Sequence, residues 1–577
     1  MIRRGLLRAG WWLSLVLVAI PAQSADKVAA PGATTAKTVS MAWKAPGAAA
    51  IASAHPLATE AGNEVLRAGG NAFDAAVAVA AALMVVEPSG SGLLGGGMFL
   101  LHRASDGRNV VIDARETAPK KATRDMFLDA SGNPVRGAST NTALAAGIPG
   151  EPAGLALMQA RYGKLKLAQT LAPAIRLARD GFDMYPRLQA GITNKRSQLA
   201  KSADANGIWF PGGEPLAIGA RVKQPQLART LETLAREGAD AFYKGALGRQ
   251  IIDAVQKMGG IWSSEDLAAY KAIEREPVVG HYRGATIISA PPPSSGGIAL
   301  IEALNILAGY DLNKVDAVTR KHLIIEAMRR MHHDRAVWLG DPAFTQVPVQ
   351  RLISADYAAG LRSSIRMDRA TPSAMLETGP EVTATGTNTT HFSVLDKDGN
   401  RVAGTITLNA GFGSGLMVDG TGLLLNNQMD DFSIKPGVPN IYGLVGDAAN
   451  AIEPGKRMLS SITPTFVESP RGYMVVGSPG GSLIIGMVLL ATLDFMDGHT
   501  AQEIVAAPRI HHQYLPDTLT YEAGALTDTE IAELKKRGHE LRSRDSWGNL
   551  QVVIYDAATG KVSSASDPRG VGTAGLY

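Results

Sequence analysis

Hydrophobic residues recur with a helical period over much of the first two thirds of the chain. Asn71 is placed to cap an Ala- and Val-rich helix, with Asp74 in the first turn of that helix. Helical patterns also dominate residues 182–380, where PPPSSGG at 291–297 interrupts them. The other helical stretches predicted in this part of the chain are 55–87, 151–163 and 165–181.

Alternating hydrophobic and polar positions become common after residue 389. There HFSVLD and RVAGTITLN flank Lys-Asp-Gly-Asn, which predicts a β-hairpin. A second hairpin is predicted from 98–102 and 109–113 around SDGR. No internal repeat or domain linker is visible, so we expect one large α+β unit. Further predicted elements are strands at 474–477 and 551–555 and an apolar helix at 482–496.

Composition narrows the chemistry that this chain can perform. It has 577 residues, of which 45% are hydrophobic and 19% charged, as in a globular protein. Cysteine is absent, which excludes thiol nucleophiles, disulfides and Cys-ligated metals. Lys and Arg number 57 against 53 acidic residues, with no dense basic run, so we expect no nucleic-acid partner. Covalent catalysis would have to use Ser, Thr, Lys, His, Tyr or a carboxylate.

The start of the chain has the pattern of a secretory signal peptide. A basic start precedes an apolar stretch at 11–20, and small residues follow at Ala22 and Ser24. The apolar stretch is shorter than the roughly 20 residues that cross a bilayer, so we expect no stable membrane span after cleavage. We predict a signal peptide over residues 1–25 and a bacterial protein that is periplasmic or secreted.

Two weaker motifs favour structure over ligand binding. GSGLLG at 90–95 matches the dinucleotide-binding pattern GxGxxG, but a helical stretch precedes it and strand-like residues follow, which favours a tight turn against another backbone. His332 and His333 are adjacent, as are His511 and His512. Adjacent histidines on a helix point about 100° apart, so they rarely bind one ion. We therefore expect no metal.

The stretch from 385 to 415 contains the richest candidate chemistry. Thr389 starts a predicted strand, where a β-branched residue needs no special explanation. Thr407 and Asn409 share one face of the next strand. If the hairpin loop is 398–400, Thr389 lies directly opposite Asn409 and Thr407 is its diagonal neighbour. A change of one residue in the loop length would alter this pairing.

Seven segments together resemble the γ-glutamyltransferase (γ-glutamyltranspeptidase) family of N-terminal nucleophile hydrolases. They occur in the family's order and span essentially the whole mature chain. The resemblance implies an α+β fold, a four-layer αββα sandwich that two autoproteolytic fragments form jointly. The segments are GGNAFDAAVA at 69–78, VIDARETAP at 111–119, TTHFSV at 389–394, TLNAGFGSG at 407–415, LLLNNQMDDFSIKPGVPNIYGLVGD at 423–447, RMLSSITPT at 457–465 and VGSPGGS at 476–482.

The resemblance further implies self-cleavage between Asn388 and Thr389. The products would be a large subunit, 26–388, and a small subunit, 389–577, which together form one structural unit. The freed α-amine of the threonine has an unperturbed pKa of about 7.7–8.0, so it can activate the neighbouring hydroxyl near neutral pH. This arrangement explains how a chain without cysteine could carry out acyl transfer.

By resemblance, Thr389 attacks the γ-glutamyl amide of glutathione or a related donor, and Thr407 orients it. The successive N–H groups of Gly480 and Gly481 match the family's oxyanion hole. An arginine fork suits the donor's α-carboxylate. Water, an amino acid or a dipeptide would then accept the γ-glutamyl group, and no metal or organic cofactor is implied. The implied binding residues are Arg115, Ser460 and Ser461 for the α-carboxylate, Asn409, Gln428 and Asp431 for the α-ammonium, and Tyr442, on a lid loop at 436–447, which would reach Asn409.

Three other functions are compatible with the same sequence. A glutaryl or cephalosporin-type acylase would share the fold, but a glutaryl group lacks the α-ammonium that Asp431 would bind. A periplasmic binding protein that never matures would need no nucleophile. A glutathione-degrading hydrolase with little transpeptidation would form the same acyl-enzyme, and the sequence does not separate water from an amino-acid acceptor.

Overall fold

The computed structural model describes residues 43–376 and 388–577, and these belong to one compact unit. The predicted signal peptide at 1–25 lies outside the described residues. None of the described helices combines the length and hydrophobicity that crossing a bilayer requires.

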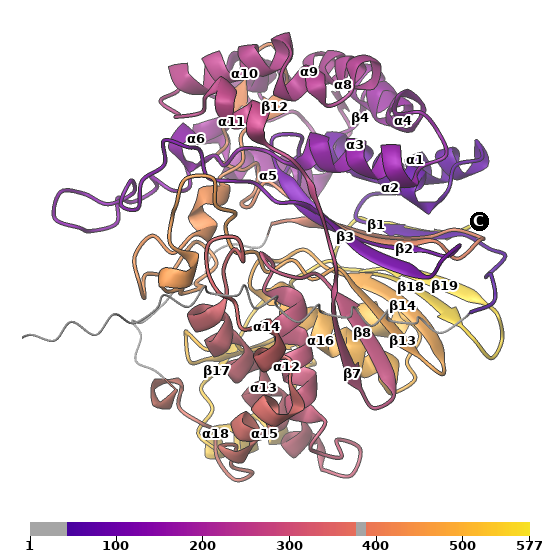
Figure 1. Ribbon diagram of the computed structural model, residues 1–577, viewed down its shortest axis with the longest axis vertical. Helices are drawn as coiled ribbons and strands as arrows, with labels where there is room; N and C mark the ends of the chain where they lie inside the picture. The colour runs from indigo at the N-terminus through magenta and orange to yellow at the C-terminus, as the bar shows by residue number, and fades with distance from the viewer. Residues whose placement is uncertain (1–42, 377–387) are drawn as a thin grey trace, which may run out of the picture. The chain divides into compact units, whose positions relative to one another are not determined.

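Two antiparallel sheets form the centre of this unit (Figure 1). In the seven-stranded sheet the order is β20 (Thr573–Leu576), β1 (Ala50–Ser53), β9 (Thr390–Leu395), β10 (Arg401–Thr407), β2 (Gly96–Arg103), β3 (Arg108–Ala114) and β6 (Ile273–Arg275). In the six-stranded sheet it is β19 (Val562–Ser566), β18 (Gln551–Asp556), β14 (Gly472–Gly477), β13 (Thr465–Ser469), β8 (Ala285–Ser289) and β7 (Val278–Tyr282).

The sheets pack face to face, with β9 and β10 against β14 and β18. Nearly every residue of these four strands is buried, because each strand is covered on both faces. One continuous core therefore joins side chains such as Met98 and Leu100 of the first sheet to Met474 and Val476 of the second.

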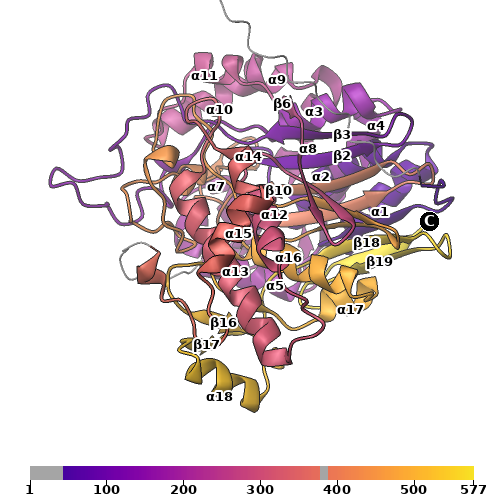
Figure 2. The ribbon, with the colours of Figure 1, turned by 60° about the horizontal axis from the view of Figure 1, so that its bottom comes forward.

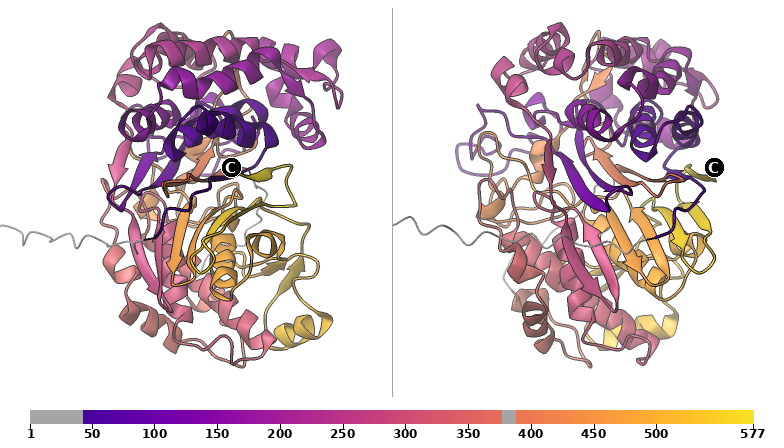
Figure 3. Two further views of the ribbon diagram at one scale, coloured as in Figure 1. Left: turned by 90° about the vertical axis from the view of Figure 1, so that its right-hand side faces the viewer. Right: turned by 45° about the vertical axis from the view of Figure 1, so that its right-hand side comes forward.

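Helices cover the outer face of each sheet and complete the four predicted layers (Figures 1 and 3). Figure 2 shows α12, α13 and α15 side by side on the six-stranded sheet's side of the unit. On the seven-stranded sheet lie α1 (Pro56–Arg67), α2 (Ala72–Val86) and α3 (Glu151–Tyr162), while α4 (Leu167–Asp180) packs against these helices and α8 (Pro225–Glu237) packs against α4. On the other side lie α12 (Gly296–Leu307), α13 (Ala317–Trp338), α15 (Ala355–Ser363), α16 (Leu483–Met496) and α17 (Ala501–Ala506).

Most predicted elements are present with bounds close to those expected. Asn71 caps α2, and its side chain and that of Asp74 form a reciprocal capping box. Every residue of α2 is buried, which explains why the stretch is apolar on all sides. The turn prediction for 90–95 also agrees with the structure, since a Cβ on Gly95 would lie 2.1 Å from the carbonyl oxygen of Thr407.

The sequence analysis did not predict β7 and β8, which lie inside the part expected to be mainly helical. Arg283 and Gly284 join these strands, with φ of 47° and 82°. Two successive positive φ angles are typical of a type I′ hairpin turn. The flanking Val and Ile residues carried the strand signal, but the helical pattern around them obscured it.

The predicted loop of the β9–β10 hairpin is displaced by one residue, which shifts the predicted pairing of the two strands by two residues. Asp396 pairs with Asn400, so the loop is 397–399 instead of 398–400. Gly399 ends this loop with φ of 94°, and the Asp396 carboxylate accepts the N–H groups of Asp398 and Asn400. In this register the position opposite residue 389 is residue 407, not 409.

Candidate active site

Thr389 lies at the head of β9, between the two sheets, and is 6% exposed. Its Oγ is 3.3 Å from the Oγ of Thr407, which ends the neighbouring strand β10. The Thr407 hydroxyl also accepts the N–H of Asn409 at 2.8 Å. The corrected register thus makes Thr407 the direct neighbour of the candidate nucleophile.

The peptide bond before Thr389 is intact, and its carbonyl is contacted by two hydroxyl groups. The Thr389 Oγ–H donates to the Asn388 oxygen, and the Tyr442 hydroxyl oxygen lies 3.3 Å from the same oxygen. The Asn388 side chain lies over Gly411, where an added Cβ would be 2.9 Å from its amide nitrogen. Glycine at 411 therefore leaves the space that this residue occupies.

Gly480 and Gly481 follow β14 and precede α16. Among the described residues neither backbone N–H has a hydrogen-bond partner. A Cβ on Gly481 would lie 2.2 Å from the Tyr442 ring, so only glycine allows the ring to pack there. Both N–H groups are therefore without an acceptor next to the pocket, which Gly481 lines.

Arg115 follows β3 and is fully buried. Its guanidinium forms an ion pair with Asp431 and donates to the carbonyl oxygens of Met458 at 3.2 Å and Leu459 at 3.3 Å. Glu116 lies behind it at 3.5 Å, and burial raises the pKa of that carboxyl to about 8 although Arg115 opposes the shift. Glu116 is then mostly neutral at pH 7, which leaves Asp431 as the charge partner of Arg115.

Asp431 lies at the end of a short 3₁₀ turn, Gln428–Asp431, that displays several polar groups together. Gln428 Nε2 donates to the Asp431 carboxylate at 3.0 Å, while Gln428 Oε1 is buried without a partner. Asn440 Nδ2 lies 3.4 Å from the other carboxylate oxygen. An unused acceptor beside a carboxylate suits a cationic ligand with several N–H groups.

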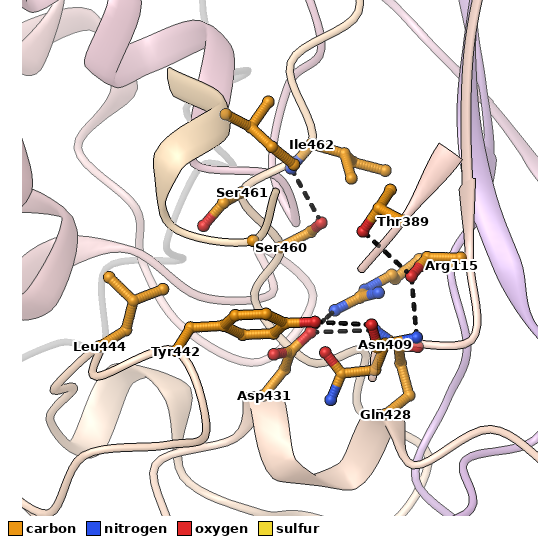
Figure 4. A pocket seen from close by; sticks show the side chains of 13 residues that line it. Arg115, Thr389, Asn409, Gln428, Asp431, Tyr442, Leu444, Ser460, Ser461 and Ile462 are labelled. Atoms are coloured by element: carbon orange, nitrogen blue, oxygen red, sulfur yellow. Dashed lines mark hydrogen bonds and ion pairs between the residues drawn. The ribbon is translucent and has the colours of Figure 1, made fainter. Parts of the chain in front are cut away.

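Ser460 and Ser461 line the same pocket as Arg115 (Figure 4). The Ser460 carbonyl accepts the backbone N–H of Ser295 at 2.9 Å and its hydroxyl at 2.7 Å. The Ser460 hydroxyl accepts the N–H of Ile462 at 3.2 Å. This segment is therefore fixed by its backbone, while both hydroxyls lie at the pocket.

Asn409 and Tyr442 close the pocket together. Asn409 has φ of 75°, a conformation that asparagine tolerates better than most residues, and its Nδ2 donates to Asn427 at 2.9 Å. The Tyr442 hydroxyl donates to the Asn409 carbonyl at 2.6 Å. The Tyr442 carbonyl in turn accepts Gln513 Nε2 at 3.1 Å, which ties the lid loop to the segment after α17.

The structure brings together nearly all residues that the sequence singled out. Arg115, Thr389, Thr407, Asn409, Gln428, Asp431, Tyr442, Ser460, Ser461 and Gly481 line one pocket, whereas Gly480 and Asn388 adjoin it. The cavity has a volume of about 20 Å³, room for about one water molecule. The cavity is therefore too small for a glutamyl group in this conformation.

Several contributing residues were not found from the sequence. Leu444, Ile462 and Ile484 form the apolar part of the pocket wall. Asn427 and Ser295 act behind the lining, on Asn409 and Ser460. Neither apolar residues in loops nor polar residues that contact the lining from behind have a distinctive spacing in the sequence. Only their position in the fold identifies them.

The adjacent histidines do not converge on a common ion position. Within the described part of the chain, one group has the spacing of a metal site, namely His322, Glu326 and His539. The carboxylate of Glu326 is already engaged, since Arg330 donates to it at 2.6 Å and Arg329 lies 3.4 Å away. These two cations disfavour a metal at this position.

A four-layer αββα fold with a threonine at the head of a central strand is the arrangement of the N-terminal nucleophile hydrolases. The family model for gamma-glutamyltranspeptidase matches residues 58–577. The chain therefore belongs to the gamma-glutamyltranspeptidase family.

Relatives of two kinds cover nearly the whole chain. The glutathione hydrolase proenzyme of Escherichia coli is 45% identical over 526 residues, 90% of each chain. The acylase ACY 1 proenzyme of Pseudomonas sp. SE83 is 39% identical and covers 90% of this chain and 92% of its own. The solved cephalosporin acylase of Bacillus halodurans superposes with a TM-score of 0.80 at 28% identity, over 92% of this chain and 95% of its own.

Proposed function

We propose that the protein is an autoprocessed γ-glutamyltransferase and glutathione hydrolase with Thr389 as its nucleophile. One observation supports this most strongly. The Thr389 hydroxyl contacts the carbonyl of the preceding residue, and the Arg115–Asp431 ion pair lines the same pocket. The first contact suits self-cleavage and the second suits a zwitterionic glutamyl donor.

Self-cleavage would begin with attack of the Thr389 Oγ on the Asn388 carbonyl carbon. The hydroxyl of Tyr442 is placed to stabilise the oxygen as it becomes negative. The C–N bond then breaks, the nitrogen takes a proton, and an ester joins Asn388 to the threonine Oγ. Water hydrolyses this ester to give a carboxylate on Asn388 and a free α-amine on Thr389. The subunits would be 26–388 and 389–577.

Donor binding would exchange one ion pair for two. In the closed pocket Arg115 and Asp431 neutralise each other. A γ-glutamyl donor has an α-carboxylate for Arg115 and an α-ammonium for Asp431, so each side chain would trade its present partner for a group of the same charge. Ser460 and Ser461 would add hydroxyl donors to the carboxylate, and the unused Gln428 Oε1 would accept from the ammonium.

Acyl transfer would then use the freed amine as base. It takes the proton of the Thr389 Oγ as that oxygen attacks the γ-carbonyl carbon, and the unpartnered N–H groups of Gly480 and Gly481 bind the oxyanion. The amine returns the proton to the departing nitrogen, which leaves a γ-glutamyl ester on the threonine. Water, an amino acid or a dipeptide resolves this ester, with glutathione as the expected physiological type of donor.

An acylase specific for glutaryl groups is the main alternative, because acylases are among the relatives. A glutaryl donor would bring a carboxylate to Arg115 but no cation to Asp431. The side chain of Asp431 is 12% exposed, so its charge would be left largely buried without a partner. This mismatch favours γ-glutamyl donors.

A periplasmic or secreted location is part of the same proposal, and so is water, an amino acid or a dipeptide as the acceptor.

The test compares the purified mature protein on three chromogenic amides. γ-Glutamyl p-nitroanilide has both charged groups, glutaryl p-nitroanilide lacks the ammonium, and 4-aminobutyryl p-nitroanilide lacks the α-carboxylate. We expect the γ-glutamyl compound to have the highest kcat/KM by at least about 100-fold, since both charges are matched. A higher kcat/KM for the glutaryl compound would identify an acylase instead. Adding glycylglycine separates transfer from hydrolysis.

A further inference from the structure

Three buried arginines lie on α13, and one of them differs from the other two. Arg329 and Arg330 are each 1% exposed and both contact the carboxylate of Glu326. Arg335 is 5% exposed, but among the described residues it has no ion-pair partner and its only hydrogen bond is through Nε. A buried cation without a counter-ion destabilises a fold, so its presence suggests a role in function.

Arg335 lies beside the donor pocket. Burial lowers its pKa to about 10, the negative charge of Asp431 raises it, and the positive charge of Arg115 lowers it further. Arg335 is therefore still a cation at neutral pH, within electrostatic range of both members of the pocket's ion pair. Without Arg335 that pair sums to zero charge. With it, a second buried cation besides Arg115 lies close to where the carboxylate would enter, which favours that carboxylate.

A hydrogen-bond relay connects Arg335 to the pocket wall. Its Nε donates to the Ser295 Oγ at 3.1 Å, and that hydroxyl donates to the Ser460 carbonyl at 2.7 Å. Arginine can only donate, so it orients the Ser295 proton toward Ser460. The Ser460 N–H in turn donates to the Pro293 carbonyl at 2.8 Å, so the backbone of Ser460 is held on both sides.

We propose that Arg335 is a positioning residue for the α-carboxylate of the donor, acting through Ser295 on the Ser460–Ser461 segment and through its own unpaired positive charge. The inference rests on the proposed γ-glutamyl transfer. It assigns to α13 a part in donor recognition, although no residue of α13 lines the pocket.

The test uses mature wild-type protein and the variants Arg335→Met, Arg335→Lys and Ser295→Ala. Methionine replaces the unbranched stem of the arginine without its guanidinium, lysine keeps the charge without the fork, and alanine at 295 removes only the relay. Arg320→Met is the matched control, because Arg320 lies on the same helix but pairs with Asp497 at the surface, at 2.5 Å. Each protein is assayed for kcat and KM with γ-glutamyl and 4-aminobutyryl p-nitroanilide.

For Arg335→Met we expect kcat/KM with the γ-glutamyl donor to fall about 10-fold or more, mainly through KM, because a carboxylate loses a buried electrostatic partner. The 4-aminobutyryl donor, which lacks the α-carboxylate, should change less than about 2-fold. Arg335→Lys should recover part of the loss, and Ser295→Ala should show a smaller loss with the same donor selectivity. The melting temperature of Arg335→Met should be unchanged or higher, since a buried unpaired charge is removed.

Equal losses on both donors would overturn the inference, because a general packing defect acts without regard to the α-carboxylate. No loss in Arg335→Met and Ser295→Ala would overturn it as well. If Arg335→Met does not fold, Arg335→Lys and Ser295→Ala decide the outcome by the same donor ratio. Failure of the proposed function would look different, because the wild-type protein would then not hydrolyse the γ-glutamyl donor.

Discussion

The pocket has two halves that the chain builds in different ways. The nucleophile half lies on paired strands: Thr389 and Thr407 are neighbours in the β9–β10 ladder, and both are nearly fully buried between the sheets. The half that would bind the donor's charged groups lies on loops, with Arg115 after β3, Asp431 in a 3₁₀ turn and Ser460 before β13.

The two halves should therefore respond differently to mutation. Sheet pairing fixes the distance between the two threonines, so the nucleophile is held by the most stable part of the fold. The charged half is held by side-chain bonds to loop carbonyls, such as those from Arg115 to Met458 and Leu459. Changes in the nucleophile half should act on the chemical step and on maturation, and changes in the charged half mainly on donor affinity.

The largest effect is expected for Thr389→Ala, which removes the hydroxyl that contacts the carbonyl of the preceding residue, Asn388. The variant should stay as one chain, and hydrolysis of γ-glutamyl p-nitroanilide should fall to the uncatalysed background. Thr389→Ser keeps a hydroxyl and should still be cut. Gel electrophoresis after incubation at neutral pH checks both. A cut Thr389→Ala chain would show that another group performs the cleavage.

A smaller loss is expected for Arg115→Lys, in the charged half. Lysine keeps the charge but cannot replace a fork that reaches Asp431 and two carbonyls at once. We expect kcat/KM for the γ-glutamyl donor to fall about 100-fold, mostly through KM, while cleavage still occurs. Arg108→Lys, on the same strand segment but with a side chain 44% exposed, is the control. A loss confined to kcat would contradict the division between the halves.

Tyr442→Phe tests the lid, which contacts both halves. It removes the hydroxyl that donates to Asn409 at 2.6 Å and lies 3.3 Å from the Asn388 oxygen but keeps the ring that packs on Gly481. Loss of a bond worth about 1 kcal/mol should raise KM about 5-fold and slow cleavage by a similar factor. Gel electrophoresis of samples taken at successive times measures the rate of cleavage, and initial rates at several donor concentrations measure KM. If neither KM nor the cleavage rate changes, the Tyr442 hydroxyl contributes to neither donor binding nor cleavage.

The smallest effect on activity is expected for Glu116→Gln, which should alter how stability depends on pH. Burial raises the pKa of Glu116 to about 8 from 4.5, so the folded state holds a proton that the unfolded state releases. The wild type should therefore lose stability as the pH rises from 4.5 to 8. Glutamine does not titrate, so the free energy of unfolding of the variant should rise relative to that of the wild type as the pH increases. We expect this relative gain to be about 1 kcal/mol or more at pH 8. The measurement is the melting temperature of both proteins at pH 5 and pH 8. An equal change in melting temperature between the two pH values for variant and wild type would contradict this.

The sequence predicts the nucleophile half better than the charged half, for a physical reason. Alternation of residues and a Gly-containing loop define a hairpin locally, so Thr389 and Thr407 could be placed on one face without any relative. The loop lies one residue earlier than expected, because the positive φ of Gly399 ends it there, and this moves the residue opposite Thr389 from Asn409 to Thr407. Arg115 and Asp431 are 316 positions apart, and no local pattern joins them. Their placement came from resemblance alone, and Arg335 was not noticed, since a buried cation on a helix has no mark in the sequence.

The central claim is that this chain cuts itself to release Thr389 as an N-terminal nucleophile. Intact-mass measurement of the purified protein, with N-terminal sequencing of each fragment, tests it most directly. The account predicts two fragments after incubation at neutral pH, the smaller one beginning at Thr389. A single uncut chain, or a small fragment that begins at another residue, would contradict it.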